Sequence, residues 1–380
     1  MRLRAAALAL VLVVSVVGAV ATPAATQEGE SGAYSGAFVE FDTTGAAVSE
    51  YAVDGAVVVE NVTVQSASET DGGIDAGLET VTSVNGSGLS VDSRTDASAT
   101  VTTGSGAEME ANDNQRGVLQ IHANGESQVV QADVGGEASS ESDKRVVVES
   151  DDGSQGAFIV VGDGEVTTNE NGDVVAQIDG DGQLVYRQYE GERDDDDKEQ
   201  ERMIQDGTAA AEVYVHGAAE SSNEAEGEAT SVVEYSEDTT VEVEERSESR
   251  INMTAERTES EGRVIITTVS EEAFGSAEST EVYVDGEAAA QADSYGDVEA
   301  ATQGADESRY LVRQSSSAEA ATDVVVGINQ FSERQVSMQS DGETGGNGGD
   351  GVSGADGPGF GTLAAIAALG AALVALRHRT

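Results

Sequence analysis

The sequence predicts an all-β protein, an antiparallel sandwich or barrel-like fold divided into two β-domains, with one or two short helices. Between residues 28 and 339, apolar and polar residues alternate with a period of two, in short runs that Gly, Asp and Asn turns interrupt. Helical periodicity is sparse over the same region. Repeated short strands without helices between them favour antiparallel sheets over a parallel α/β sheet.

The alternating runs are expected strands, and they occur at residues 37–42, 57–65, 145–150, 157–164, 239–245, 263–270 and 323–331. Two longer stretches each predict a strand, a tight turn and a returning strand. Residues 174–189 turn at Asp179-Gly180-Asp181-Gly182, and residues 281–291 turn at Asp285-Gly286, a pair that suits a two-residue hairpin loop.

Two stretches predict helices. Residues 193–207 carry acids in the first turns and end at Gly207, which indicates a short exposed helix, and residues 294–304 predict a second one. The region from 28 to 339 is longer than a usual single domain of about 100–150 residues. We therefore expect one β-rich domain at 28–192, an acidic helical connector at 193–207 and a second β-rich domain at 208–339.

The composition is strongly acidic, with 72 Asp plus Glu against 19 Lys plus Arg and a formal net charge of −53. Such self-repulsion strains a compact fold in dilute buffer, but at molar salt the Debye length falls to about 3 Å and screens it. Lys144 and Lys198 are the only lysines. This balance resembles that of proteins from extreme halophiles, and it excludes nucleic acid as a partner because a polyanion needs a basic surface. The chain has no Cys, so thiolate chemistry is excluded, and we expect no cofactor.

Residues 1–27 predict a signal peptide that a signal peptidase removes. Two arginines precede an uncharged stretch at 5–20, and Ala19 and Ala21 satisfy the small-residue rule for cleavage. The alternative is a buried helix, but a strictly N-terminal run with basic flanks favours export.

The C-terminal segment predicts a membrane-directed tail. Residues 340–357 form a Gly- and Asp-rich spacer, and this composition predicts a flexible, solvated tether. Residues 361–376 are uncharged and would reach about 24 Å as a helix, less than the ~30 Å hydrocarbon core. Arg377 and Arg379 follow and would stay on the cytoplasmic side. An ordinary C-terminal membrane helix is the alternative.

The order of Pro358-Gly359-Phe360, an apolar run and arginines resembles the PGF-CTERM sorting signal of haloarchaeal surface proteins, over residues 358–380. The resemblance implies that an archaeosortase removes the tail and that a lipid replaces it, leaving the rest of the chain anchored outside the cell. Residues 281–312 and 331–338 are also similar to parts of other PGF-CTERM ectodomains, which carry no activity over to this chain.

Three sequons, beginning at Asn61, Asn85 and Asn252, are candidate N-glycosylation sites. In the strand at 57–65, alternation places Asn61 on the outward face.

Motifs for catalysis or metal binding are absent. His122, His216 and His378 are the only histidines, and none lies in a G-x-S-x-G elbow or an H-E-x-x-H pair. The Asp clusters do not form an EF-hand loop.

We therefore expect a non-catalytic, glycosylated surface protein with a structural role in the cell envelope or a role in contacts with other envelope proteins. The alternative is a surface hydrolase or a calcium-dependent binding protein whose site forms only in the fold.

Overall fold

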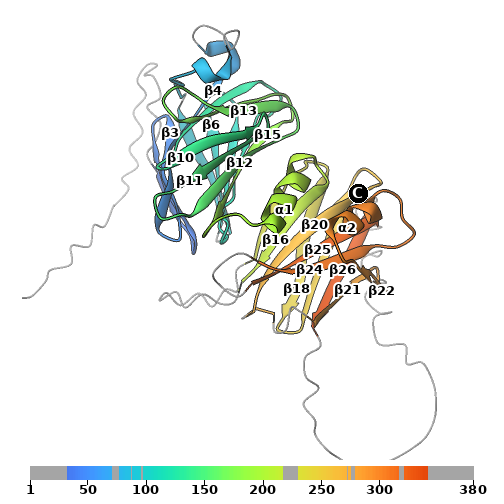
Figure 1. The fold of residues 1–380 in the computed structure, drawn as a ribbon. Coiled ribbons are helices and arrows are strands. Elements are labelled where there is room, and N and C mark those ends of the chain that lie inside the picture. The colour runs from blue at the N-terminus through green and yellow to red at the C-terminus, as the bar shows by residue number, and fades with distance from the viewer. Residues whose placement is uncertain are drawn as a thin grey trace, which may run out of the picture. The chain divides into compact units, whose positions relative to one another are not determined.

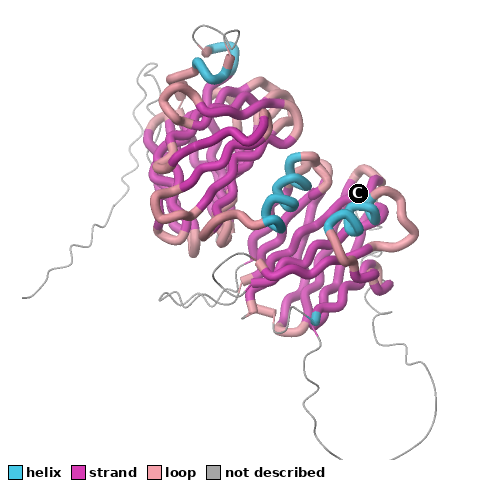
Figure 2. Tube along the Cα trace, viewed as in Figure 1, coloured by secondary structure: helices cyan, strands magenta, loops and turns pink. Residues whose placement is uncertain are grey.

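The computed structural model describes residues 32–70, 77–86, 88–95, 97–216, 230–271, 273–274, 279–315 and 321–340. All of them belong to one compact unit of the chain. The fold is β-rich, with four sheets and two α-helices in these residues (Figures 1 and 2). The predicted signal peptide, the sorting segment and all of the spacer except Ser340 lie outside the described residues.

Two antiparallel sheets are built from residues 32–189. Sheet A has the order β1-β2-β3-β4-β9-β14-β13 and contains β1 (Gly32–Ser35), β2 (Val39–Thr44), β3 (Ala47–Val53), β4 (Ala56–Ser66), β9 (Gln128–Asp133), β13 (Gly164–Thr168) and β14 (Val174–Ile178). Sheet B has the order β10-β11-β12-β15-β8-β7-β6-β5 and contains β5 (Leu89–Arg94), β6 (Ser98–Thr103), β7 (Glu108–Asn112), β8 (Leu119–His122), β10 (Glu137–Ser142), β11 (Arg145–Glu149), β12 (Gln155–Val161) and β15 (Gln183–Tyr189).

Sheets A and B pack face to face around a core of Val, Ala and Ile with a few aromatic rings. At one margin the sheets also meet edge to edge, because the Val166 amide donates to the Asp143 carbonyl at 2.8 Å and the hydroxyls of Ser140 and Thr167 lie 3.3 Å apart. The arrangement is therefore a sandwich that is partly closed like a barrel.

Two further sheets are built from residues 209–340. Sheet C has the order β17-β16-β20-β25-β24-β23 and contains β16 (Ala209–Val215), β17 (Thr230–Glu234), β20 (Glu261–Ser270), β23 (Ala290–Gln291), β24 (Arg309–Gln314) and β25 (Ala321–Gln330). Sheet D has the order β18-β19-β26-β21-β22 and contains β18 (Thr239–Ser247), β19 (Arg250–Arg257), β21 (Thr280–Val284), β22 (Glu287–Ala288) and β26 (Glu333–Ser340). A second core of Val, Ile and Met lies between these two sheets.

A third core joins the two pairs of sheets. Helix α1 (Asp195–Gln205) places Met203 and Ile204 among apolar side chains of sheets B and C. Helix α2 (Tyr295–Thr302) packs Val298 against the same face of sheet C (Figure 1). Both sandwiches thus contribute apolar side chains to one continuous interior.

The all-β prediction is confirmed, and the Asp285-Gly286 hairpin is present between β21 and β22. Both turn residues have positive φ, 53° and 80°, as a two-residue loop of this kind requires.

The predicted return at Asp179 to Gly182 does not make a hairpin. β14 pairs with β13 and β9 in sheet A, whereas β15 pairs with β12 and β8 in sheet B. The turn crosses from one sheet to the other because β15 is buried at all of its positions. A hairpin with one solvated face would leave half of those side chains in water.

Sheet C is not purely antiparallel, since β16 runs parallel to β20 and β23 runs parallel to β24. Helix α1 was expected to be exposed, and this was wrong for one of its faces. Asp197, Gln200, Glu201, Met203 and Ile204 are buried. The reason is that the helix fills the space between sheets B and C.

Candidate functional site

The acidic run that begins α1 forms its N-terminal cap. The Asp194 carboxylate accepts the Asp197 amide at 2.8 Å, and the Asp197 carboxylate accepts the Asp194 amide at 3.1 Å. This reciprocal pair satisfies amides that have no partner within the helix, and the negative charges favour the positive end of the helix dipole. The acidic run therefore has a role in starting the helix.

Two buried ion pairs link the N-terminal sheets to the segment that follows them. Arg116, in the loop between β7 and β8, contacts Asp197 of α1 at 3.0 Å. Arg187 of β15 contacts Glu212 of β16 at 2.8 Å, and both side chains are 1% exposed. Glu212 also accepts hydrogen bonds from Tyr214 at 2.8 Å and Tyr235 at 2.7 Å. The second pair is thus surrounded by polar partners inside an apolar interior.

A third cluster surrounds Glu201 of α1. Its carboxylate contacts Arg145 at 3.0 Å and Arg193 at 3.3 Å, and it accepts the Tyr189 hydroxyl at 2.7 Å. We call the interlinked set the connector brace; its members are Arg116, Arg145, Arg187, Arg193, Asp197, Glu201 and Glu212. The brace is made of charges that water does not reach, apart from the partly exposed Arg145.

The brace was not predicted from the sequence. The sequence contained one indication of a buried charge. Arg187 interrupts the apolar run LVYRQY, in a stretch that otherwise predicts a buried strand. A charge in such a position requires a buried partner. The partner, Glu212, could not be identified because the acidic residues are so numerous.

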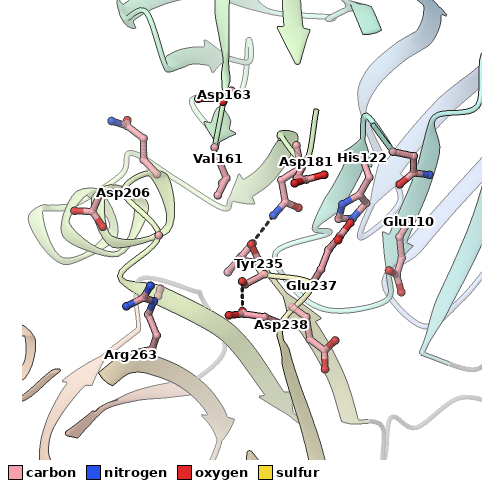
Figure 3. A pocket seen from close by; sticks show the side chains of 18 of the residues that line it. Glu110, His122, Val161, Asp163, Asp181, Asp206, Tyr235, Glu237, Asp238 and Arg263 are labelled. Carbon is pink, nitrogen blue, oxygen red and sulfur yellow. Dashed lines mark hydrogen bonds between the residues drawn. The ribbon is translucent and has the colours of Figure 1, made fainter. Parts of the chain in front are cut away.

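A polar cleft of about 810 Å³ lies beside the brace, where β7 and β8 face the start of β16 and the end of β17 (Figure 3). Acidic side chains dominate its lining, and they are Glu108, Glu110, Asp163, Asp181, Asp206, Glu234, Glu237 and Asp238. His122 and Arg263 also line it. The prediction that His122 ends a strand is confirmed, and its ring faces this cleft (Figure 3).

Burial changes the titration of three groups in the cleft. It raises the pKa of Glu110, to which the neighbouring Glu108 charge adds, and it raises the pKa of Glu234. Burial lowers the pKa of His122, and Glu108 opposes that change. Carboxyl groups with raised pKa values beside an imidazole with a lowered pKa are groups that acid–base chemistry uses, and such perturbed groups gather at functional sites.

His216 lies elsewhere and does not line this cleft. It follows the last residue of β16, as its sequence position predicts, and its side chain is buried. Burial and the nearby Arg246 charge lower the pKa of His216 to about 4. The structure therefore does not assemble the two described histidines into one site.

The three sequons differ in exposure. Asn61 and Asn85 are exposed, and Asn61 has the outward orientation that alternation predicts for it. Asn252 is partly buried and donates a hydrogen bond to Glu245 at 2.7 Å. A glycan is a surface modification, so the first two asparagines offer the better acceptor sites. The cleavage residues Ala19 and Ala21 and the sorting residues Pro358, Gly359, Phe360, Arg377 and Arg379 lie outside the described residues.

In the described ranges, no three acidic or histidine side chains are arranged to hold a metal ion. Those ranges also contain no helix with the length and apolar character needed to span a bilayer.

Comparison with known proteins adds little information about this cleft. No family model matches the chain, and no curated protein matches it. Among solved structures, a polysaccharide lyase is similar at 10% sequence identity and a TM-score of 0.23, over 79% of this chain and 45% of the lyase. At that TM-score the likeness supports no inference about activity.

Proposed function

We propose that the chain is a non-catalytic, acidic, N-glycosylated cell-surface protein, anchored through a processed C-terminal sorting segment, with a structural role in the envelope or a role in contacts with other envelope proteins. The connector brace is the observation that carries the proposal. Asp197, Glu201 and Glu212 each contact an arginine inside the protein. Buried charges committed to such pairs hold one geometry, since removing either partner leaves the other uncompensated. A fixed geometry of this kind suits a structural role.

The surface supports the same proposal. Val57 is the one large apolar side chain that is strongly exposed in the described residues. The net charge of −53 favours solubility at high salt. Asn61 and Asn85 present exposed acceptors for glycans.

The anchoring part of the proposal is tested by mass spectrometry on the native membrane fraction of a halophilic host that expresses the full chain. We expect the mature C-terminus to lie at or before Phe360 and to carry a lipid. The matched control replaces Pro358, Gly359 and Phe360 with alanine and should retain its tail. A wild-type peptide that ends in RHRT in the membrane fraction would refute processing.

The role in the envelope is tested by deleting the gene and recording cell shape and adhesion. We expect a change in at least one of the two, with restoration by the wild-type chain. Restoration by the alanine-substituted variant as well would show that anchoring is unnecessary for the role.

The acidic cleft favours a second candidate, a surface hydrolase, because Glu110, Glu234 and His122 combine perturbed protonation with access to a cavity. The test is a screen of the full chain against glycoside and ester substrates at constant high salt, with Glu110→Gln and Glu234→Gln as variants. Glu256→Gln, an exposed position outside the cleft lining, is the matched control. Activity that the first two variants abolish and the control retains would replace the non-catalytic proposal.

The calcium-dependent alternative has its own measurement. A ligand that binds the folded state raises its stability by mass action. A midpoint of thermal unfolding that rises with calcium, at constant high ionic strength, would support it.

A further inference from the structure

His216 is an ionisable side chain that neither the connector brace nor the cleft uses. It is 4% exposed, and neither its Nδ1 nor its Nε2 has a hydrogen-bond partner among the residues that the structure describes. An imidazole is a polar group that water solvates well, so burying it without a partner costs free energy. A buried imidazole of this kind is tolerated only where the packing of the neutral ring offsets that cost.

The ring packs between two aromatic side chains from different parts of the chain. Its centroid lies 4.8 Å from that of Phe38 and 6.2 Å from that of Tyr214. Tyr214 belongs to β16 of sheet C, whereas Phe38 belongs to the turn between β1 and β2 of sheet A. The contact between His216 and Phe38 therefore joins the first described hairpin to the C-terminal sheets.

The turn that carries Phe38 is itself held firmly. The Asp113 carboxylate accepts the amides of Ala37, Phe38 and Val39 at 2.6, 2.8 and 2.8 Å. Because these bonds fix the backbone on the N-terminal side, movement at this contact falls on the His216 side chain.

Among the described residues, the charged and titratable groups around the ring do not favour an imidazolium. Arg246 of β18 donates to the His216 carbonyl at 3.2 Å, and its positive charge repels a second cation. The Tyr214 hydroxyl is committed to Glu212, and the Asp113 carboxylate to the three amides of the turn. The attraction between the Phe38 ring and a cation is weaker than the cost of burying an unpaired charge.

We propose that His216, Phe38 and Tyr214 form an acid-sensitive latch: protonation of His216 expels its ring from between the two aromatic side chains and releases the β1–β2 turn from the C-terminal sheets.

The pKa of His216, lowered to about 4 by burial and by Arg246, sets the pH range of this latch. In the unfolded chain the ordinary value is about 6.5, so the unfolded state binds more protons between these two values. Above pH 6.5 the stability that the contact contributes is unchanged. It decreases as the pH falls through this window, and the full loss is reached below about pH 4. The difference of 2.5 units corresponds to a change of about 300-fold in the unfolding equilibrium.

Local release is tested with Phe38→Trp in the full chain, which has no other Trp. Fluorescence is recorded from pH 7 to pH 3 at constant high salt, with far-UV circular dichroism as a check on the fold. We expect the emission to shift to the red with a midpoint near pH 4, before the circular dichroism changes, and to stay flat in Phe38→Trp/His216→Phe. The same titration in both variants would overturn the proposal.

A second measurement applies even if the whole protein unfolds in acid. Urea unfolding of the wild type and of His216→Phe is compared at pH 7 and pH 4.5. From the difference between these pKa values we expect the folding equilibrium of the wild type to fall by about 60-fold more than that of the variant over this interval. His122→Gln is the matched control, since it removes the other described histidine, which is half-buried, and should retain most of the loss. Equal losses in the wild type and in His216→Phe would refute the latch.

Discussion

Replacing Arg187 with methionine tests whether the connector brace stabilises the fold. Arg187 and Glu212 are each 1% exposed and lie 2.8 Å apart. Removing one partner of a fully buried pair costs about 3–5 kcal/mol, because the remaining charge has lost its counter-charge in a poorly solvated place. The Glu212 carboxylate keeps the hydroxyls of Tyr214 and Tyr235 as donors. We therefore expect a loss near the lower limit, about 3 kcal/mol.

Substituting the other partner of the pair, as in Glu212→Gln, should cause a larger loss of stability. It leaves the Arg187 guanidinium with the Tyr189 hydroxyl at 3.2 Å and the Gln200 side chain at 3.4 Å, both neutral. We expect about 4–5 kcal/mol, and the double variant Arg187→Met/Glu212→Gln should lose less than the sum of the single losses.

The assay is urea unfolding at constant high salt, monitored by circular dichroism, with stability taken from the midpoint and slope. Arg263→Met is the matched control. Arg263 contacts Glu261 at 3.4 Å, with the two side chains 25% and 72% exposed, so we expect a change of at most about 1 kcal/mol. A loss below 1 kcal/mol for Arg187→Met, or strictly additive single losses, would refute the reasoning.

Three further substitutions are checked by the same unfolding assay. Asp113→Asn weakens the three amide contacts of the β1–β2 turn and should cost about 2–3 kcal/mol, whereas an unchanged midpoint would show that the turn does not need the charge. Ile204→Ala should cost about 2–5 kcal/mol because it opens a cavity under α1, while Glu199→Ala on the exposed face of that helix should stay within about 0.5 kcal/mol; similar losses would contradict the packing described. A Cβ at Gly327 would lie 2.4 Å from the Val298 carbonyl oxygen, so Gly327→Ala should displace α2 and cost about 1–3 kcal/mol; a neutral result would place α2 farther from β25.

The strands were predictable because alternation is a local property. The runs at 57–65, 145–150 and 263–270 correspond to β4, β11 and β20 within a few residues. The hairpin at Asp285-Gly286 was also predictable, since its turn residues tolerate positive φ and its two strands pair with each other.

Strand partners were not predictable, because pairing depends on residues far away in the sequence. β14 and β15 are separated by one turn, yet they lie in different sheets. The parallel pairing of β16 with β20 spans three intervening strands of the chain. Alternation does not say whether the next strand returns to the same sheet or crosses to the facing one.

The prediction that α1 is exposed was wrong for one of its faces, and the reason is different. Its stretch DDDDKEQER is so polar that the sequence predicts exposure to solvent. The structure buries Asp197 and Glu201 because Arg116 of the β7–β8 loop contacts the first and Arg145 of β11 contacts the second. Charge alone does not predict exposure when a partner of opposite sign is available, and the partner comes from the tertiary fold. The cleft was missed for a related reason, since Glu110 and Glu234 are distant in sequence and come together only in the fold.

The position of β26 has a mechanical consequence. It is the last described strand, and it lies between β19 and β21 in the interior of sheet D, antiparallel to both. A force applied to the chain beyond Ser340 along the strand direction would load the hydrogen bonds of both neighbours together, in shear. Withdrawing β26 requires these bonds to break at the same time, whereas a strand at the edge of the sheet could peel away one bond after another. The C-terminal segment is thus connected to sheet D through an interior strand, which resists such a force better than an edge strand would.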